Sequence, residues 1–244
     1  MKNRLKNNQG NRHLKERYDL MTYILGARCQ NGVVLVADKK GIEGNTSTKM
    51  QKIRKIDGYG YIGFSGTEET YNTFELALTQ YEFPENIKNK LVLISTLISK
   101  INKRFPLDEQ IELLYAYYND KINQWEIKKF NQYGGMSNVH EEQAIGSGRQ
   151  MGQIFIKTTA KAVREQKKDK IEMMSGIGII IIRAIEKLGL DENVGMGVTA
   201  YLLYDEPKVE IIDTDYKDNE KCLQIADNII KALTMLLTDG QSNV

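Results

Sequence analysis

The sequence contains few of the residues that build disulfide frameworks and zinc sites, with two cysteines and two histidines among its 244 residues. Cys29 and Cys222 lie far apart in the chain, which is not the pattern of a disulfide scaffold and fits a reducing cytosol. We expect Cys29, inside an apolar stretch, to be a small buried side chain. Four such residues, with His13 and His140 as the histidines, argue against a Cys/His zinc site.

Long apolar runs are also absent. The best run, at 177–182, is far shorter than the roughly 20 residues that cross a bilayer. The amino end has no apolar core like that of a secretory signal. The net charge of +2 gives no basis for a general role on nucleic acid or on a membrane. We therefore expect a cytoplasmic protein, with no nucleic-acid or membrane partner, whose 41% hydrophobic residues can bury a real core.

The small net charge is unevenly distributed. Residues 1–20 carry six Lys and Arg against Glu16 and Asp19, a net of +4, which leaves about −2 for the remainder. This segment is polar and has almost no periodic apolar residues, which is typical of a disordered arm. We predict that residues 1–21 are a basic arm, a propeptide or a mis-assigned start of translation, and that 22–240 form one domain.

The clearest local signal is a β-hairpin near the start of that domain. Asn31-Gly32 stands between two apolar runs, which is the strongest short-range hairpin signal. The second run, at 33–37, is almost continuously apolar, as in a strand that is covered on both faces. Thr22 begins the first strand and Asp38 closes the second, so the hairpin can bring the two side chains together.

The rest of the chain alternates between strand and helix patterns. We expect further strands at 51–57, 59–64, 113–119, 124–130, 144–148, 198–204 and 208–212, with 41–47 as a polar connection. Helical spacing is expected at 67–81, 87–105, 150–164, 170–188 and 219–237. Pairs of helices that follow groups of strands predict an α+β fold in which helices pack on sheets.

Four further segments carry a resemblance to a known family. They are K-I-R-K-I-D at 52–57, I-G-F-S-G at 62–66, A-I-G-S-G at 144–148, and the region 183–203. Together with the hairpin, their order and spacing resemble a proteasome β subunit, an N-terminal-nucleophile hydrolase whose first mature residue is a threonine. The resemblance covers most of 22–213 and implies a four-layer αββα sandwich. It also implies a ring with proteasome-type α and β subunits or copies of the chain itself, polypeptide substrates, a regulatory ATPase, and no metal or organic cofactor.

The resemblance makes Thr22 the nucleophile. A threonine hydroxyl must lose a proton to attack, and an adjacent free α-amine, with a pKa near 7.7–8.0, is a suitable base. That amine exists only after the Met21–Thr22 bond has been cut. Without the surrounding pattern, Thr22 would be read as a strand residue chosen for β propensity.

Two charged residues support the nucleophile in this family. Asp38 matches the acid that orients a catalytic lysine, and Lys52 matches that lysine. Its ammonium would keep the α-amine neutral and stabilise the alkoxide of Thr22. The loop before Lys52 is shorter than in the family, so Arg54 and Lys55 are alternatives.

Backbone and polar groups complete the implied site. Gly63 matches the glycine whose N–H binds the oxyanion, and Gly66 competes for that role. Ser147 matches a serine that holds the amine and a water. Asp191 matches a second acid, although residues 192–193 could shift the register by one. The pocket for the side chain before the cut would involve Gly41, Met50 and Tyr61.

Three residues depart from the pattern of active members. Met21 replaces the usual glycine, Tyr23 replaces a second threonine, and Val194 replaces a serine. Thr22 would be exposed either by methionine removal, if translation starts at Met21, or by self-cleavage of a propeptide. The leading hypothesis is a threonine endopeptidase. The alternatives are a non-catalytic structural subunit of a ring and another N-terminal-nucleophile amidohydrolase.

Overall fold

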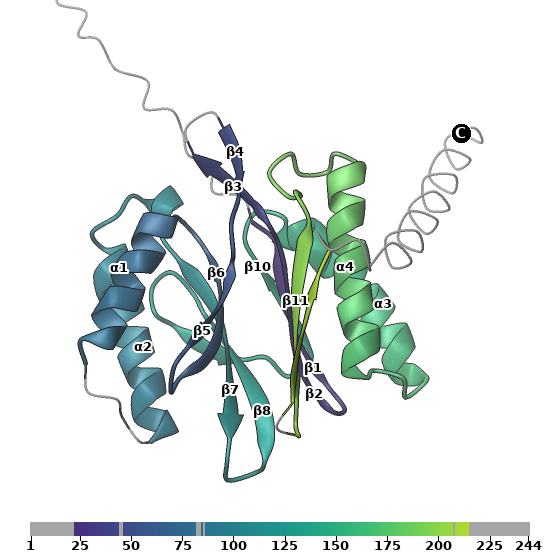
Figure 1. Cartoon of the computed structure of the whole chain (residues 1–244), viewed down its shortest axis with the longest axis horizontal. Helices are drawn as coiled ribbons and strands as arrows, with labels where there is room; N and C mark the ends of the chain where they lie inside the picture. Colours follow the sequence, from purple (N-terminus) through teal and green to yellow (C-terminus); the bar gives the residue numbers. More distant parts are fainter. Residues whose placement is uncertain (1–21, 44–45, 82–83, 85, 207, 215–244) are drawn as a thin grey trace, which may run out of the picture.

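The computed structural model describes residues 22–43, 46–81, 84, 86–206 and 208–214. Figure 1 shows two β-sheets that face each other, with one pair of helices on the outer side of each. The α+β class predicted from the sequence is confirmed.

The first sheet contains the predicted hairpin. Its strand order is β10-β1-β2-β11-β12, with β1 (Ile24–Cys29), β2 (Gly32–Asp38), β10 (Glu142–Ile145), β11 (Val198–Tyr204) and β12 (Val209–Asp213). Cys29 lies opposite Gly32 at the turn, and Gly32 has a φ of +150°. All seven residues of β2 are buried. Val34 and Val36 pack into the cluster on the helix side of the sheet, and Val33 and Leu35 into the cluster between the sheets, so both faces are covered and the apolar run is unbroken.

The second sheet has the order β5-β6-β7-β8-β9. Its strands are β5 (Ile53–Ile56), β6 (Gly60–Ser65), β7 (Glu112–Asn119), β8 (Gln124–Phe130) and β9 (Met136–Asn138). The predicted connection at 41–47 is wrong, because β3 (Lys40–Glu43) and β4 (Thr46–Lys49) form a two-stranded ribbon there. β4 is polar, β9 has Met136 as its one apolar residue, and both strands are mainly exposed, so an alternation of apolar residues could not reveal them.

Four α-helices are described: α1 (Glu68–Thr79), α2 (Ile87–Asn102), α3 (Arg149–Glu165) and α4 (Ile171–Lys187), with a short 3-10 helix η1 (Leu107–Glu109). The second helix ends at Asn102 rather than at 105, because the chain continues as a tighter turn in which the N–H groups of Arg104 and Phe105 donate to carbonyls three residues back. The helix predicted at 219–237 lies outside the described residues.

Three apolar clusters hold these elements together. Tyr71 of α1 belongs to the cluster between the first helix pair and the second sheet. Ile182 of α4 belongs to the cluster between the second helix pair and the first sheet. Leu35 and Leu114 belong to a third cluster, contributed by the inner faces of both sheets. Two covered sheets in contact fix the relative positions of strand ends that are distant in sequence.

The candidate site lies where such ends meet. Asp38 is the last residue of β2, and its N–H donates to the Tyr23 carbonyl at 3.2 Å. Lys52 directly precedes β5, and its carbonyl accepts the N–H of Phe64 at 3.0 Å. The two sheets therefore deliver an acid and a lysine to one place from the ends of their strands.

Candidate functional site

Asp38 is the most extensively bonded side chain of the site. Its carboxylate accepts the N–H of Tyr23 at 2.8 Å, of Lys40 at 3.1 Å and of Gly195 at 3.4 Å. The residue is 1% exposed. These bonds join the amino-terminal end of the domain to the segment after β2 and to the segment before β11.

Lys52 forms a buried ion pair with this carboxylate. Its ammonium donates to the two Asp38 oxygens at 2.9 and 2.8 Å, and the side chains are 1% and 0% exposed. The two alternatives are engaged elsewhere. Arg54 bonds Glu68 of helix α1 at 2.8 Å, and Lys55 lies in solvent, 3.8 Å from Asp57.

Burial perturbs both members of the pair. It lowers the pKa of Lys52, while the Asp38 charge and hydrogen bonds oppose that shift. It raises the pKa of Asp38, with Lys52 and the backbone donors opposing. Each charge is therefore stable in this position chiefly because the other is present.

Thr22 is buried beside the glycine turn that follows β10. It is 4% exposed, and its carbonyl packs so closely on Gly146 that a Cβ there would lie 1.8 Å from the oxygen. The next residue, Tyr23, donates its N–H to Asp38 and packs its ring on Gly152 of α3. The residue that directly follows Thr22 is thus bonded through its backbone N–H to the carboxylate of the Asp38–Lys52 pair.

A second polar pair lies close to the first. The Ser147 hydroxyl donates to an Asp191 oxygen at 2.7 Å. The other Asp191 oxygen accepts the N–H of Asn193 at 3.0 Å. The negative charge of Asp191 favours the charged form of Lys52, which places the two pairs in one electrostatic neighbourhood. The acid that Ser147 bonds is therefore Asp191 and not a residue at 192–193. Val194 is buried in the apolar core.

The two glycines considered for the oxyanion differ in their surroundings. Gly63 lies inside β6, opposite Ile53 and Leu114. Since the Phe64 N–H is directed at β5, the Gly63 N–H is directed at β7 by the alternation of a strand. Gly66 follows β6 with a φ of +122° and lines a cavity of about 360 Å³ together with Ser147.

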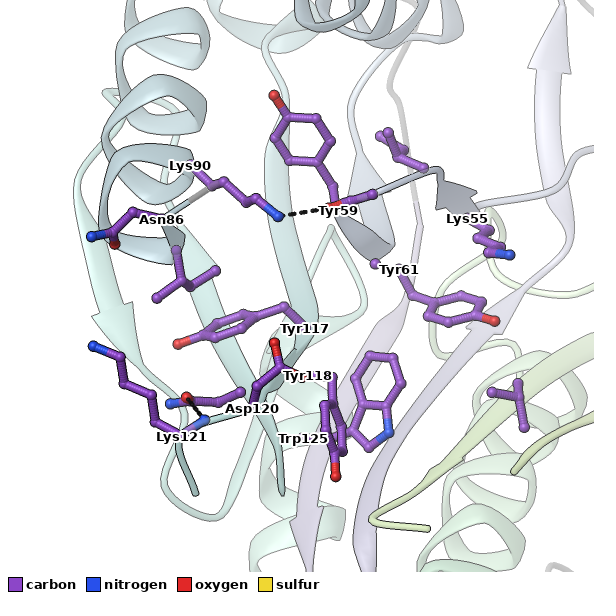
Figure 2. Close-up of a pocket in the computed structure, with 16 residues that line it drawn as sticks. Lys55, Tyr59, Tyr61, Asn86, Lys90, Tyr117, Tyr118, Asp120, Lys121 and Trp125 are labelled. Carbon is purple, nitrogen blue, oxygen red and sulfur yellow. Dashed lines mark hydrogen bonds between the residues drawn. The ribbon is translucent and has the colours of Figure 1, made fainter. Parts of the chain in front are cut away.

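The three residues expected to form a substrate pocket are only partly brought together. A Cβ on Gly41 would lie 3.2 Å from the Met50 Cβ, so these two residues are neighbours. Tyr61 packs its ring at 5.8 Å from Trp125 and 5.5 Å from Tyr201. It lines a different cavity, of about 700 Å³, which Figure 2 shows.

Some partners in the site were not identified from the sequence. The backbone N–H groups of Gly195 and Lys40 bond Asp38, and Asn193 bonds Asp191. The sequence did contain a signal for Gly195, because a second glycine, Gly197, follows two residues later. Both adopt positive φ, which is typical of a tight turn. Within the described residues, no group of three or more His, Cys, Asp or Glu could hold a metal ion. In the same part of the chain, every helix is too short or too polar to span a bilayer.

Comparison with known families gives one match over most of the domain. The model of the proteasome subunit family matches residues 21–194. The chain is 27% identical over 138 residues to a proteasome subunit beta of Streptosporangium roseum and 28% identical over 167 residues to that of Stackebrandtia nassauensis. These matches cover 52% and 62% of this chain, and 49% and 58% of the two relatives. The proteasome subunit beta of Methanococcus vannielii is 26% identical over 218 residues, 82% of this chain and 94% of that protein.

Solved structures show a similar fold. Anbu (ancestral beta-subunit) from Yersinia bercovieri superposes with a TM-score of 0.71 at 13% identity, over 89% of this chain and 97% of that one. The Gly-1 mutant of Anbu from Hyphomicrobium sp. strain MC1 gives 0.66 at 10% identity, over 91% and 97%. At these identities the likeness concerns the fold alone.

Proposed function

Because the chain belongs to the proteasome subunit family, we propose that it is the threonine-type endopeptidase subunit of a proteasome-like particle. The observation that carries the proposal is the buried Asp38–Lys52 pair, which is bonded to the backbone directly after Thr22. A buried ion pair is weak support for stability, since apolar residues of similar volume often serve as well or better. A subunit with only a structural role has no evident need for this pair at this position.

The reaction begins when Thr22 has become the first residue. The Thr22 Oγ attacks the carbonyl carbon of a peptide bond, and the α-amine of the same residue accepts the hydroxyl proton. The tetrahedral intermediate then collapses, the amine returns the proton to the departing amino group, and an ester remains on Thr22. Water, deprotonated by the same α-amine, hydrolyses that ester and regenerates the free hydroxyl.

The surrounding charges tune this base and this nucleophile. The Lys52 ammonium disfavours a second positive charge nearby, so it keeps the α-amine neutral and stabilises developing negative charge on Thr22 Oγ. Asp38 fixes the position of Lys52. Ser147 and Asp191 hold the amine and a water, in line with their mutual bond.

The oxyanion donor in this proposal is a backbone N–H near the carboxyl end of β6. Gly63 is the residue implied by the sequence resemblance, but its N–H is directed at β7. Gly66 has the advantage of lining one cavity with Ser147. We therefore assign the oxyanion to Gly66. Gly41 and Met50 form one side of the pocket for the substrate residue before the cut, without Tyr61.

The same proposal extends to the particle. We place the subunit in a cytoplasmic ring, built with proteasome-type α and β subunits or with copies of itself, that degrades polypeptides delivered by a regulatory ATPase. Its domain would be a four-layer αββα sandwich, in line with the three apolar clusters between the helices and sheets.

The test compares four proteins: a chain that begins at Thr22, the same chain with Met21 retained, and the Thr22→Ala and Thr22→Ser variants. Each is measured for assembly by size-exclusion chromatography and for hydrolysis of a mixture of fluorogenic peptides. We expect hydrolysis from the chain that begins at Thr22, a weaker rate with serine, and none from the other two. Normal assembly without hydrolysis in all four would favour the structural subunit. Hydrolysis of small amides by a monomer, without turnover of long peptides, would favour another amidohydrolase.

A further inference from the structure

A second cavity lies at the other end of strand β5 from the candidate site. It has a volume of about 700 Å³ and is formed by the end of β5, the start of β6, the amino-terminal end of α2 and the β7–β8 turn (Figure 2). Lys52 precedes β5 and Ile56, which lines the cavity, ends it, so the two sites are about 13 Å apart along the strand. Its size is within the range of about 300–1,000 Å³ found for ligand pockets.

Aromatic rings form much of the wall. Five line the cavity: Tyr59, Tyr61, Tyr117, Tyr118 and Trp125. The Trp125 ring lies 5.8 Å from Tyr61 and 5.7 Å from Tyr118, in tilted and edge-on arrangements. Its Nε1–H donates to the Tyr204 carbonyl at 2.9 Å, which fixes the indole in place. Such a wall is suited to the flat face or edge of another ring.

The charged residues of the wall are mainly positive. Lys55, Lys90 and Lys121 come from β5, α2 and the β7–β8 turn, and Asp120 is the single acid among the lining residues described. The described lining residues thus contain three positive groups and one negative group, and Lys55 also lies 3.8 Å from Asp57. The Lys90 ammonium is fixed beside the cavity, because it donates to the Gly58 carbonyl at 2.8 Å. Burial also lowers the pKa of Lys90, which indicates that this ammonium is partly desolvated.

The start of helix α2 adds to this positive field. Asn86 caps the helix and lines the cavity, and the first turn contains no acidic residue that would offset the positive end of the helix dipole. Lys90, Lys121 and the amino terminus of α2 thus line the same cavity as five aromatic rings. An anion and an aromatic ring are thus favoured in the same space.

We propose that this cavity binds an aromatic acid, a small molecule in which a carboxylate is attached to an aromatic ring. The ring packs among Tyr61, Tyr118 and Trp125, and the carboxylate is directed at Lys90 and Lys121. A neutral aromatic compound would satisfy only the rings, and a simple anion only the lysines. The site is independent of the proposed chemistry at Thr22.

The chain contains its own reporter for this cavity, because Trp125 is its single tryptophan. Indole fluorescence of the full chain is measured during titration with three probes: phenylacetate, its neutral isostere phenylacetamide, and acetate. We expect saturable changes with phenylacetate at a Kd about tenfold lower than with phenylacetamide, and none with acetate. Equal affinity for the acid and the amide, or no saturable change with either, would overturn the proposal.

Matched lysine substitutions locate the charge contact. Lys90→Gln and Lys121→Gln should each raise the phenylacetate Kd by about fivefold to tenfold and leave the phenylacetamide Kd unchanged. Lys100→Gln is the control, because Lys100 lies in the last turn of the same helix and does not line the cavity. Circular dichroism shows whether each variant is folded. Folded variants of both lysines with unchanged phenylacetate affinity would contradict the assignment.

Discussion

The buried pair of Asp38 and Lys52 makes a quantitative prediction about stability. Both side chains are essentially inaccessible, so removing one partner leaves the other as an uncompensated buried charge. We expect Lys52→Met and Asp38→Asn each to lower the free energy of unfolding by about 3–5 kcal/mol. For a domain of this size that corresponds to a Tm about 6–20 °C lower.

The two substitutions should not be equal. In Lys52→Met, the Asp38 carboxylate still accepts backbone N–H groups from Tyr23, Lys40 and Gly195. In Asp38→Asn, the ammonium loses its anion, and the new NH₂ group is directed at backbone donors. Asp38→Asn is therefore the more destabilising change.

The assay is urea unfolding of the wild type, both single variants and the double variant. The double variant has no buried charge without a partner. We therefore expect its free energy of unfolding to be about 2–3 kcal/mol higher than the sum of the two single effects predicts. Lys161→Met is the matched control, since its ion pair with Glu165 is 78% and 67% exposed and contributes about 0.5 kcal/mol or less. Additive effects, or single variants within about 1 kcal/mol of the wild type, would refute the reasoning.

Three further predictions follow from individual residues. Burial raises the pKa of the Cys29 thiol to about 12, so in a Cys222→Ser background a thiol reagent at pH 8 should react only after unfolding; rapid labelling of the native protein would contradict this. A Cβ on Gly152 would lie 1.9 Å from the Tyr23 ring, whereas one on Gly176 would meet nothing within 4 Å. Gly152→Ala should therefore lower the melting temperature, and Gly176→Ala should raise stability by about 0.5–1 kcal/mol. Peptide hydrolysis should decline on the acid side with a midpoint below about 7.7, because the base must be neutral and Lys52 lowers the pKa of the α-amine; a midpoint well above 8 in a pH–rate profile would contradict that role for Lys52.

Local patterns predicted the hairpin and most helices because they depend on neighbouring residues. Asn31-Gly32 specifies a turn, and the apolar run of β2 specifies burial, wherever the rest of the chain lies. The ribbon of β3 and β4 was missed because Thr46–Lys49 has no apolar face that a sequence pattern could reveal. Only its backbone pairing with β3 identifies it as a strand. Element ends are harder to predict, because α2 passes into a tighter turn at Arg104 and Phe105 without a change in the residue pattern.

The candidate site required the family resemblance, because its pairs join residues that are distant in sequence. Nothing within a local window distinguishes Lys52 from Arg54 or Lys55; the difference is that Arg54 lies against Phe64 and Tyr71 on the helix side of the sheet. The backbone donor from Gly195 arrives from 157 residues away. Tyr61 illustrates the converse: the resemblance placed it in the substrate pocket, but its ring packs with Trp125 and Tyr201 and lines a different cavity.

The central claim is that Thr22 acts as an amino-terminal nucleophile. The most direct test is the intact mass and amino-terminal sequence of the assembled protein, purified from its native cell. The account predicts a chain that begins at Thr22, so that the hydroxyl and its base belong to one residue. An assembled protein that retains Met21 in front of Thr22 would have no such base, and the endopeptidase proposal would give way to a structural subunit.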